Sequence, residues 1–311
     1  MSIAKKYAAF FTCVQAFIVI LLSSTLAFAE ITIILKNDFI EKYKNRATID
    51  ANYIVDMAHK QPNPPSKDGD IHIAGRSDDI QLPVVAEIMN AASRIDAIEK
   101  VHAVEGKGNA VEVSGAWRIW CEHGGNSVQQ QGQKLEQFQT TNPDHVFQIH
   151  PVSSFAGIDV TDTFRPINGF KTKDAHEAFV KYEGITSKIS VNNKNKTTSI
   201  QTTMAGYNYV EFIMELSGDQ KEVTDGRFVF ASVRDLEGEL LVRNRRMVFV
   251  RGTEPEKIVK TLKKGDRLHV LGIPRIDLAL LSWRAKNYKK RPEVLTWNLP
   301  YEIIVVAAYK D

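Results

Sequence analysis

One short pattern occurs twice in this chain and limits what the chain can fold into. Residues 107–115 read KGNAVEVSG, and residues 264–272 read KGDRLHVLG. Each copy begins with Lys-Gly and a turn residue, continues as an alternating segment that predicts a β-strand, and closes on Gly. Apolar residues at three- and four-residue spacing precede each copy and predict a short helix. The repeat therefore indicates that one β-rich unit is used twice.

The predicted strands around the two copies follow the same order. Alternating segments at about 48–55, 71–75 and 84–89 precede the first helix, and segments at about 207–216, 228–233 and 240–250 precede the second. A last strand follows each copy, at about 146–152 and 301–309. Strand-strand-strand-helix-strand-strand is the order of the OB-fold, a small five-stranded barrel. We therefore predict a mainly β protein with a few short helices, built as two tandem OB-like β-barrels. An unrelated pair of β-rich domains is the alternative.

These elements divide the chain into four parts. Residues 1–29 are a predicted signal peptide, and residues 30–165 form the first barrel. Residues 166–206 are a linker with a short helix and a hairpin, and residues 207–311 form the second barrel. Polar segments at 124–142 and 276–298 separate the fourth and fifth strands of the two barrels. This loop borders the ligand face of OB-folds, so we expect binding loops or spacers there.

The first 29 residues have the three parts of a secretory signal. Lys5 and Lys6 give a positive start, an apolar run is densest at 14–22, and Ala27 and Ala29 are the small residues before the cleavage point. We expect cleavage after Ala29 and a periplasmic or secreted bacterial protein. The alternative is an uncleaved anchor, since about 20 apolar residues span a bilayer. No later segment is apolar enough to be predicted as a transmembrane span.

Charge is distributed unevenly along the chain. The formal net charge of +3 is too small to predict a general attraction to nucleic acid or to anionic membranes. Residues 30–180 contain 15 Lys and Arg against 21 Asp and Glu, whereas residues 240–295 contain 15 against 5. This asymmetry predicts two units with different surfaces, or two halves held together by opposite charge. Cys121 is the one cysteine after the predicted signal, and its strand-like surroundings predict a buried, inert thiol.

Histidine and carboxylate residues gather in the first predicted barrel, where six of the eight histidines lie between residues 59 and 150. Asp70 and His72 are two apart on a strand, so both side chains leave the same face. Glu87 lies on the next strand, His123 ends the fourth strand and His150 lies on the fifth. These five residues would offer nitrogen and oxygen ligands to a divalent metal such as zinc or manganese. A buried hydrogen-bond network, or a ligand-binding face, explains the same residues.

Four segments of this barrel resemble a group of uncharacterised exported bacterial proteins. They read DGDIH at 68–72, VAEI at 85–88, GAWRIWCEH at 115–123 and NPDHVFQIHPV at 142–152. The resemblance spans about residues 47–155 and implies an OB-like first domain in a bacterial envelope protein. It implies no activity, because none is established for that group. Gln148 stands where those proteins usually have Glu, which weakens any role that needs a carboxylate there.

The second predicted barrel carries a basic and aromatic set instead. It consists of Trp283, Arg284, Lys286 and Tyr288, with Arg243 and Arg245 on a neighbouring predicted strand. Cations and flat rings together suit anionic ligands such as phosphates or acidic sugars. Nucleic acid is less favoured, because an exported chain seldom meets it. We expect an acidic glycan, another anionic ligand or an envelope protein as the partner, and a solvated basic loop is the alternative.

Known catalytic signatures are missing from this sequence. It contains no Gly-x-Ser-x-Gly elbow, no Walker loop and no dinucleotide fingerprint. We therefore predict a non-catalytic envelope protein that binds a ligand or a partner. The alternative is a metal-dependent hydrolase, for example a nuclease, that uses the histidine and carboxylate residues of the first barrel.

Overall fold

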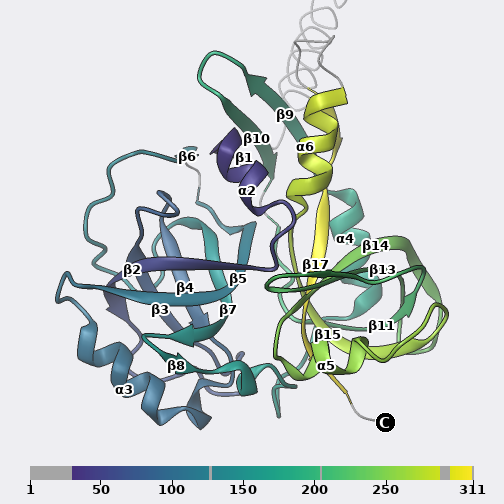
Figure 1. The fold of residues 1–311 in the computed structure, drawn as a ribbon, viewed down its shortest axis with the longest axis horizontal. Helices are drawn as coiled ribbons and strands as arrows, with labels where there is room; N and C mark the ends of the chain where they lie inside the picture. Colours follow the sequence, from purple (N-terminus) through teal and green to yellow (C-terminus); the bar gives the residue numbers. More distant parts are fainter. Residues whose placement is uncertain (1–29, 126–127, 204, 288–294, 310–311) are drawn as a thin grey trace, which may run out of the picture.

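Two closed five-stranded β-barrels lie side by side (Figure 1), which confirms the predicted pair of tandem OB-like barrels. The structure is a computed structural model that describes residues 30–125, 128–203, 205–287 and 295–309. The first barrel consists of β2 (Thr48–Ala58), β3 (Ile71–Arg76), β4 (Val84–Ile88), β5 (Ala110–His123) and β7 (His145–Phe155). The second consists of β11 (Val210–Leu216), β13 (Gly226–Arg234), β14 (Leu240–Val250), β15 (Arg267–Ile276) and β17 (Tyr301–Ala308). Each barrel is closed by a parallel pairing of its third and fifth strands, β4 with β7 and β14 with β17.

A short helix lies between the third and fourth strands of each barrel, as the sequence predicts. It is α3 (Ile95–Val104) in the first barrel, preceded by the 3-10 turn η1 (Ala91–Ser93), and α5 (Glu254–Val259) in the second. Proline stands in the first turn of α5, where a helix does not need its missing N–H. Two short strands, β8 (Ile158–Asp159) and β12 (Lys221–Val223), extend the barrel sheets. Within the described ranges, no helix is long and apolar enough to cross a bilayer.

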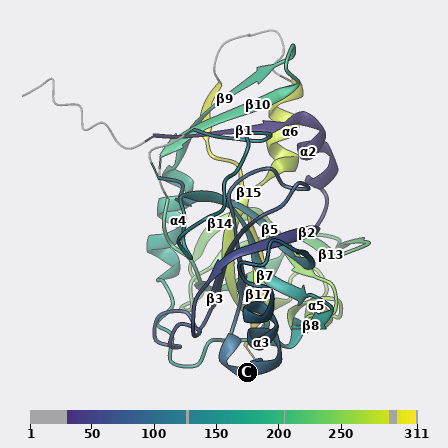
Figure 2. The same cartoon turned by 90° about the vertical axis from the view of Figure 1, so that its left-hand side faces the viewer.

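A third sheet lies at one end of the barrel pair (Figures 1 and 2). It contains β1 (Glu30–Lys36), β6 (Val128–Gln130), β9 (Thr186–Asn192), β10 (Thr197–Thr203) and β16 (Leu295–Asn298), in the order β16-β9-β10-β1-β6. Helices α2 (Asn37–Tyr43) and α6 (Leu278–Asn287) pack against each other beside it. Helix α4 (Ala175–Gly184) packs on the second barrel, and the turn η2 (Thr161–Thr163) follows β8. Both polar segments that we expected to be loops therefore contribute a strand to this sheet.

The segment 276–298 differs most from its expected loop, because it contains helix α6. Leu278, Leu281 and Ser282 recur at helical spacing and are buried. The side chain of Asp277 accepts a hydrogen bond from the N–H of Leu280 at 2.9 Å and so satisfies a free donor of the first turn. Basic residues follow this short apolar face, so the sequence pattern of the segment did not predict a helix.

The two barrels pack through an apolar interface, and β17 shows how one strand serves both sides. Side chains of a strand alternate between its two faces. Ile303 and Val305 belong to the main hydrophobic core, whereas Ile304 and Val306 belong to the cluster between the barrels. Every residue of β17 is buried as a result. The barrels therefore form one packed unit.

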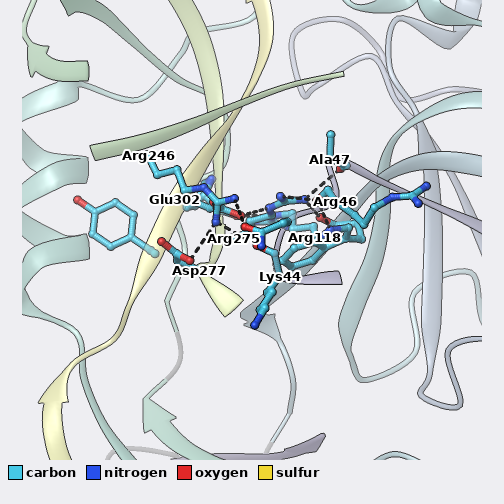
Figure 3. Close-up of polar contacts among 12 residues, drawn as sticks. Lys44, Arg46, Ala47, Arg118, Arg246, Arg275, Asp277 and Glu302 are labelled. Carbon is cyan, nitrogen blue, oxygen red and sulfur yellow. Dashed lines mark hydrogen bonds and ion pairs between the residues drawn. The ribbon is translucent and has the colours of Figure 1, made fainter. Parts of the chain in front are cut away.

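Two buried arginines of the second barrel cross this interface (Figure 3). Arg275 Nε donates to Glu302 Oε1 at 2.7 Å, and Arg275 Nη1 donates to the carbonyls of Ala47 at 3.1 Å and Trp117 at 2.9 Å. The Arg275 guanidinium also lies 3.5 Å from the centre of the Trp117 ring. Arg246 lies 3.3 Å from the other carboxylate oxygen of Glu302. Basic residues of the second barrel thus bind backbone carbonyls and an aromatic ring of the first.

Candidate functional site

Three side chains of the first barrel, Asp70, Glu87 and His150, meet in a cluster that we call the acid–histidine trio. Asp70 immediately precedes β3, Glu87 lies on β4 and His150 lies on β7. His150 Nε2 is 3.2 Å from Asp70 Oδ2, and His150 Nδ1 is 3.4 Å from Glu87 Oε2. One ligand atom from each residue lies within 4.8 Å of the other two. The trio is therefore close enough to hold a metal ion.

The trio lies on the outer surface of the first barrel, because its strands alternate. The neighbouring residues Ile71, Ala86 and Ile149 belong to the hydrophobic core. Tyr209, which precedes β11 of the second barrel, covers the trio. Its hydroxyl donates to Asp70 Oδ2 at 2.5 Å and lies 2.7 Å from His150 Nε2. Docking of the second barrel thus encloses a polar surface of the first.

Glu87 is the most connected member of the trio. Gln148 Nε2 donates to Glu87 Oε1 at 2.5 Å, and Arg118 Nη1 donates to the side-chain oxygen of Gln148. His72 Nε2 lies 3.6 Å from Glu87 Oε2. Gln148 therefore joins a carboxylate to an arginine and adds no third negative charge.

The environment of the trio moves the three pKa values apart. Burial raises the pKa of Asp70 to about 6, although the hydrogen bond to His150 opposes it. Burial acts in the same direction on Glu87, but the cationic forms of His150 and His72 and the charge of Arg118 outweigh it and lower the pKa of Glu87 to about 2. The two carboxylates raise the pKa of His150 against the effect of its burial. Because the pKa of His150 is raised, a metal ion would compete with a proton for this imidazole.

Of the other predicted metal ligands, His72 lies at the edge of the trio and His123 lies away from it. The His72 ring stacks on His59 at 4.6 Å between ring centres. The His123 ring stacks on His145 at 5.2 Å, and His123 Nε2 lies 4.0 Å from Glu122 Oε1. The structure therefore brings together Asp70, Glu87 and His150 with His72 beside them, without His123.

Two buried atoms of the trio suit a metal ion. Among the residues that the structure describes, none forms a hydrogen bond with Asp70 Oδ1 or His150 Nδ1. A donor set of one imidazole and two carboxylates fits a divalent metal. Access is poor, however, because Asp70 and His150 are 0 % exposed and Glu87 is 3 % exposed. A groove beside them is lined by Gly69 and Arg165 and by no member of the trio.

Cys121 lies on β5 and is buried. Burial raises the pKa of its thiol to about 12, so the reactive thiolate is not formed near neutral pH. The predicted burial of Cys121 is confirmed.

The two arginines predicted as ligand-binding residues on β14 have different surroundings. Arg243 is exposed. Arg245 Nη2 donates to Glu183 Oε1 at 2.6 Å, and its guanidinium lies 3.9 Å from the centre of the Tyr301 ring. Arg245 is therefore oriented by the protein, whereas Arg243 faces solvent.

Three of the other predicted ligand-binding residues lie in α6. Arg284 Nη1 donates at 2.7 Å to a carbonyl at the end of β16, and Lys286 Nζ lies 2.9 Å from Glu41 Oε1. Trp283 is 56 % exposed. Tyr288 lies outside the described residues. The basic set is thus largely used in contacts within the protein.

A groove of about 370 Å³ lies between the β13–β14 surface and the start of α6, and we call it the β14 groove. Its lining includes Asp219, Lys221, Phe230, Asn244, Arg245 and Leu280. In OB barrels, the second and third strands and the loops after the first and fourth strands form the ligand face. The groove occupies this face of the second barrel, because β13 and β14 are the barrel's second and third strands.

Phe230, Asn244 and Leu280 line the groove but were not among the residues that the sequence predicts as ligand-binding. One signal for Phe230 was present. Val229 and Ala231 of β13 are buried in the core, so alternation places Phe230 outside, where it is 51 % exposed. A large exposed ring on a barrel strand is a candidate ligand contact.

Comparison with known proteins identifies no relative. No protein-family model matches the chain, and no curated protein matches it. The geometry of the trio and of the β14 groove is therefore the basis for assigning a function.

Proposed function

We propose that this chain is a non-catalytic binding protein of the bacterial envelope and that its ligand occupies the β14 groove. The observation that carries the proposal is the position of the groove on the ligand face of an OB-like barrel. The groove offers the exposed ring of Phe230 together with the cations Lys221 and Arg245. A ring surface beside cations suits an anionic ligand with an apolar face.

The enclosure of the trio favours this function over catalysis. A catalytic site must admit its substrate to the reacting groups. Tyr209 of the second barrel covers Asp70 and His150, and both are 0 % exposed. A buried polar network that joins the two barrels is consistent with these contacts.

Export would give the groove its partners. The predicted signal, with cleavage after Ala29, lies outside the described residues. We propose that it directs the protein to the periplasm or to the cell exterior. Acidic glycans, other anionic compounds and envelope proteins are then the candidates for the groove.

A thermal-shift screen tests the binding function. We expect at least one anionic compound among carboxylates, phosphates, sulfates and uronic acid oligosaccharides to raise the melting temperature, because a ligand that binds only the folded state stabilises it. Leu280→Arg would fill the groove, since Leu280 lines it and is only partly buried. The variant should abolish the shift.

The matched control is Ile95→Arg, a similar substitution at a residue that is 66 % exposed on α3 of the first barrel. This variant should respond to ligands as the unsubstituted protein does. Ligands that shift Leu280→Arg and the unsubstituted protein equally would place binding outside the groove and contradict the proposal.

A metal-dependent hydrolase is the second candidate, and the trio is the observation that favours it. Asp70, Glu87 and His150 would hold the ion, and zinc or manganese suits this donor set. Such an ion supplies an activated water for hydrolysis. Tyr209 would then have to move from Asp70 and His150 to admit a substrate.

Metal analysis of the purified protein separates the two functions. The hydrolase requires about one zinc or manganese ion per chain, which His150→Gln should remove and His123→Ala should retain, because His123 lies outside the trio. We expect folded protein without stoichiometric metal, as the binding function implies. Stoichiometric metal together with metal-dependent hydrolysis of phosphodiesters or esters would favour the hydrolase instead.

A further inference from the structure

The side chains of the β14 groove favour one class of anionic ligand. We infer that the groove binds an acidic oligosaccharide, a chain of sugar rings with isolated carboxylates, rather than a polyphosphate such as single-stranded nucleic acid. This inference rests on the proposed function. It follows from the arrangement of rings, cations and acceptors around the groove.

One exposed aromatic ring lines the groove, and a second lies on the helix that borders it. Phe230 lines it from β13 and is 51 % exposed. Ala279 and Leu280 line it from α6. Trp283 lies four residues after Ala279 and three residues after Leu280, which places it on the same helical face. Trp283 is 56 % exposed. The apolar faces of sugar rings pack on aromatic rings of this kind, so Phe230 and Trp283 would contact rings of one extended ligand.

The cations of the groove are mostly neutralised within the protein. Arg245 lies 2.6 Å from a carboxylate oxygen of Glu183. Arg246 lies 3.4 Å from Asp277 and 3.3 Å from a second carboxylate. Lys221 is the exposed lysine of the lining, and exposed Arg243 lies nearby on β14. A polyphosphate strand is bound by a row of cations that follows its closely spaced charges. A ligand with isolated carboxylates needs only a few cations, as this groove offers.

Acceptors beside these cations favour a sugar further. Asp219 lines the groove and is exposed, and its carboxylate would repel a phosphate strand. The same carboxylate would accept hydrogen bonds from sugar hydroxyls. Asn45 and Asn244, both exposed in the lining, add amide donors and acceptors. Mixed donors and acceptors suit the hydroxyl groups of an oligosaccharide better than a uniform row of phosphates.

Calorimetric titration of the purified protein tests this inference. The probes are tetramers of galacturonic, glucuronic and mannuronic acid, a neutral glucose tetramer and an eight-residue oligothymidylate. We expect a uronic acid tetramer to bind at least tenfold more tightly than the other two probes. Phe230→Ala should weaken that binding about tenfold or more, because it removes a stacked ring. Phe230→Tyr keeps the ring and should bind within about threefold of the unsubstituted protein.

The control variant is Ile95→Ala, on the first barrel, which should leave the affinity unchanged, and the melting temperature of each variant confirms folding. Preferred binding of the neutral tetramer or of oligothymidylate would overturn the inference. So would uronate binding that Phe230→Ala leaves intact. If no uronate binds while other ligands are still lost in Leu280→Arg, the inference fails and the proposed function stands. If no ligand depends on the groove, both fail.

Discussion

Replacing Arg275 with methionine is expected to lower the free energy of unfolding by about 3–5 kcal/mol. The substitution leaves the Glu302 carboxylate buried without its 2.7 Å partner and removes the donor to the carbonyls of Ala47 and Trp117. Burial raises the pKa of Glu302 and lowers the pKa of Arg275, although their mutual attraction acts in the opposite direction. Burial therefore destabilises either charge when the other is removed. Urea unfolding at pH 7, followed by circular dichroism, measures the loss.

Two variants show whether the loss comes from the buried pair. Arg243→Met removes an exposed arginine from the same barrel and should change stability by less than about 0.5 kcal/mol. Adding Glu302→Gln to Arg275→Met should recover at least about 1 kcal/mol, because it removes a buried carboxylate that has lost its closest arginine and keeps Arg246 at 3.3 Å. A loss below about 1 kcal/mol for Arg275→Met would mean that this arginine contributes little to joining the barrels.

The barrels could be predicted because their strands carry local signals. β11 alternates between buried and partly buried residues, and β17 is a short continuous apolar run, so each indicates a strand without knowledge of its partners. The third sheet could be predicted only in part: the hairpin of β9 and β10 has a local signal, whereas two of its other strands have none. Its strands β6 and β16 have three and four residues and pair with distant segments, as Gln129 does with Ile33 and Thr296 with Lys188. Short strands of this kind are defined by long-range pairing, which a local pattern does not contain.

The trio could be predicted in part, since alternation puts Asp70, Glu87 and His150 on one side of their strands. Burial could not be predicted, because it depends on Tyr209 and on how the second barrel docks. Register explains why His123 is remote. It pairs with His145, which is five residues, or roughly 16 Å, along β7 from His150. Strand membership alone does not give this position along the barrel.

Replacing Glu87 with glutamine is expected to lower stability by about 3 kcal/mol at pH 7 and by little at pH 2. Within the fold, burial raises the pKa of Glu87, but the cationic forms of His150 and His72 and the charge of Arg118 outweigh it, so the pKa falls from 4.5 to about 2. A carboxyl with a lowered pKa in the folded state stabilises the fold above pH 4.5, and this contribution disappears as the pH falls toward 2. A pKa difference of this size corresponds to about 3 kcal/mol.

The pH dependence of the Glu87→Gln effect distinguishes charge from shape, because glutamine nearly preserves the shape of the side chain. Urea unfolding of both proteins at pH 7, 5 and 3 should show a difference that shrinks steadily below pH 4.5. Glu112→Gln, at an exposed residue of β5, should differ from the unsubstituted protein by less than about 0.5 kcal/mol throughout. An equal loss at pH 7 and pH 3 would show that packing of residue 87 matters and that its charge does not.

The opposite sign holds for Asp70, whose raised pKa makes its protonation favour the fold as the pH falls through about 6. The two carboxylates of the trio therefore oppose each other in acid, and the comparison with Glu87→Gln separates the contribution of Glu87.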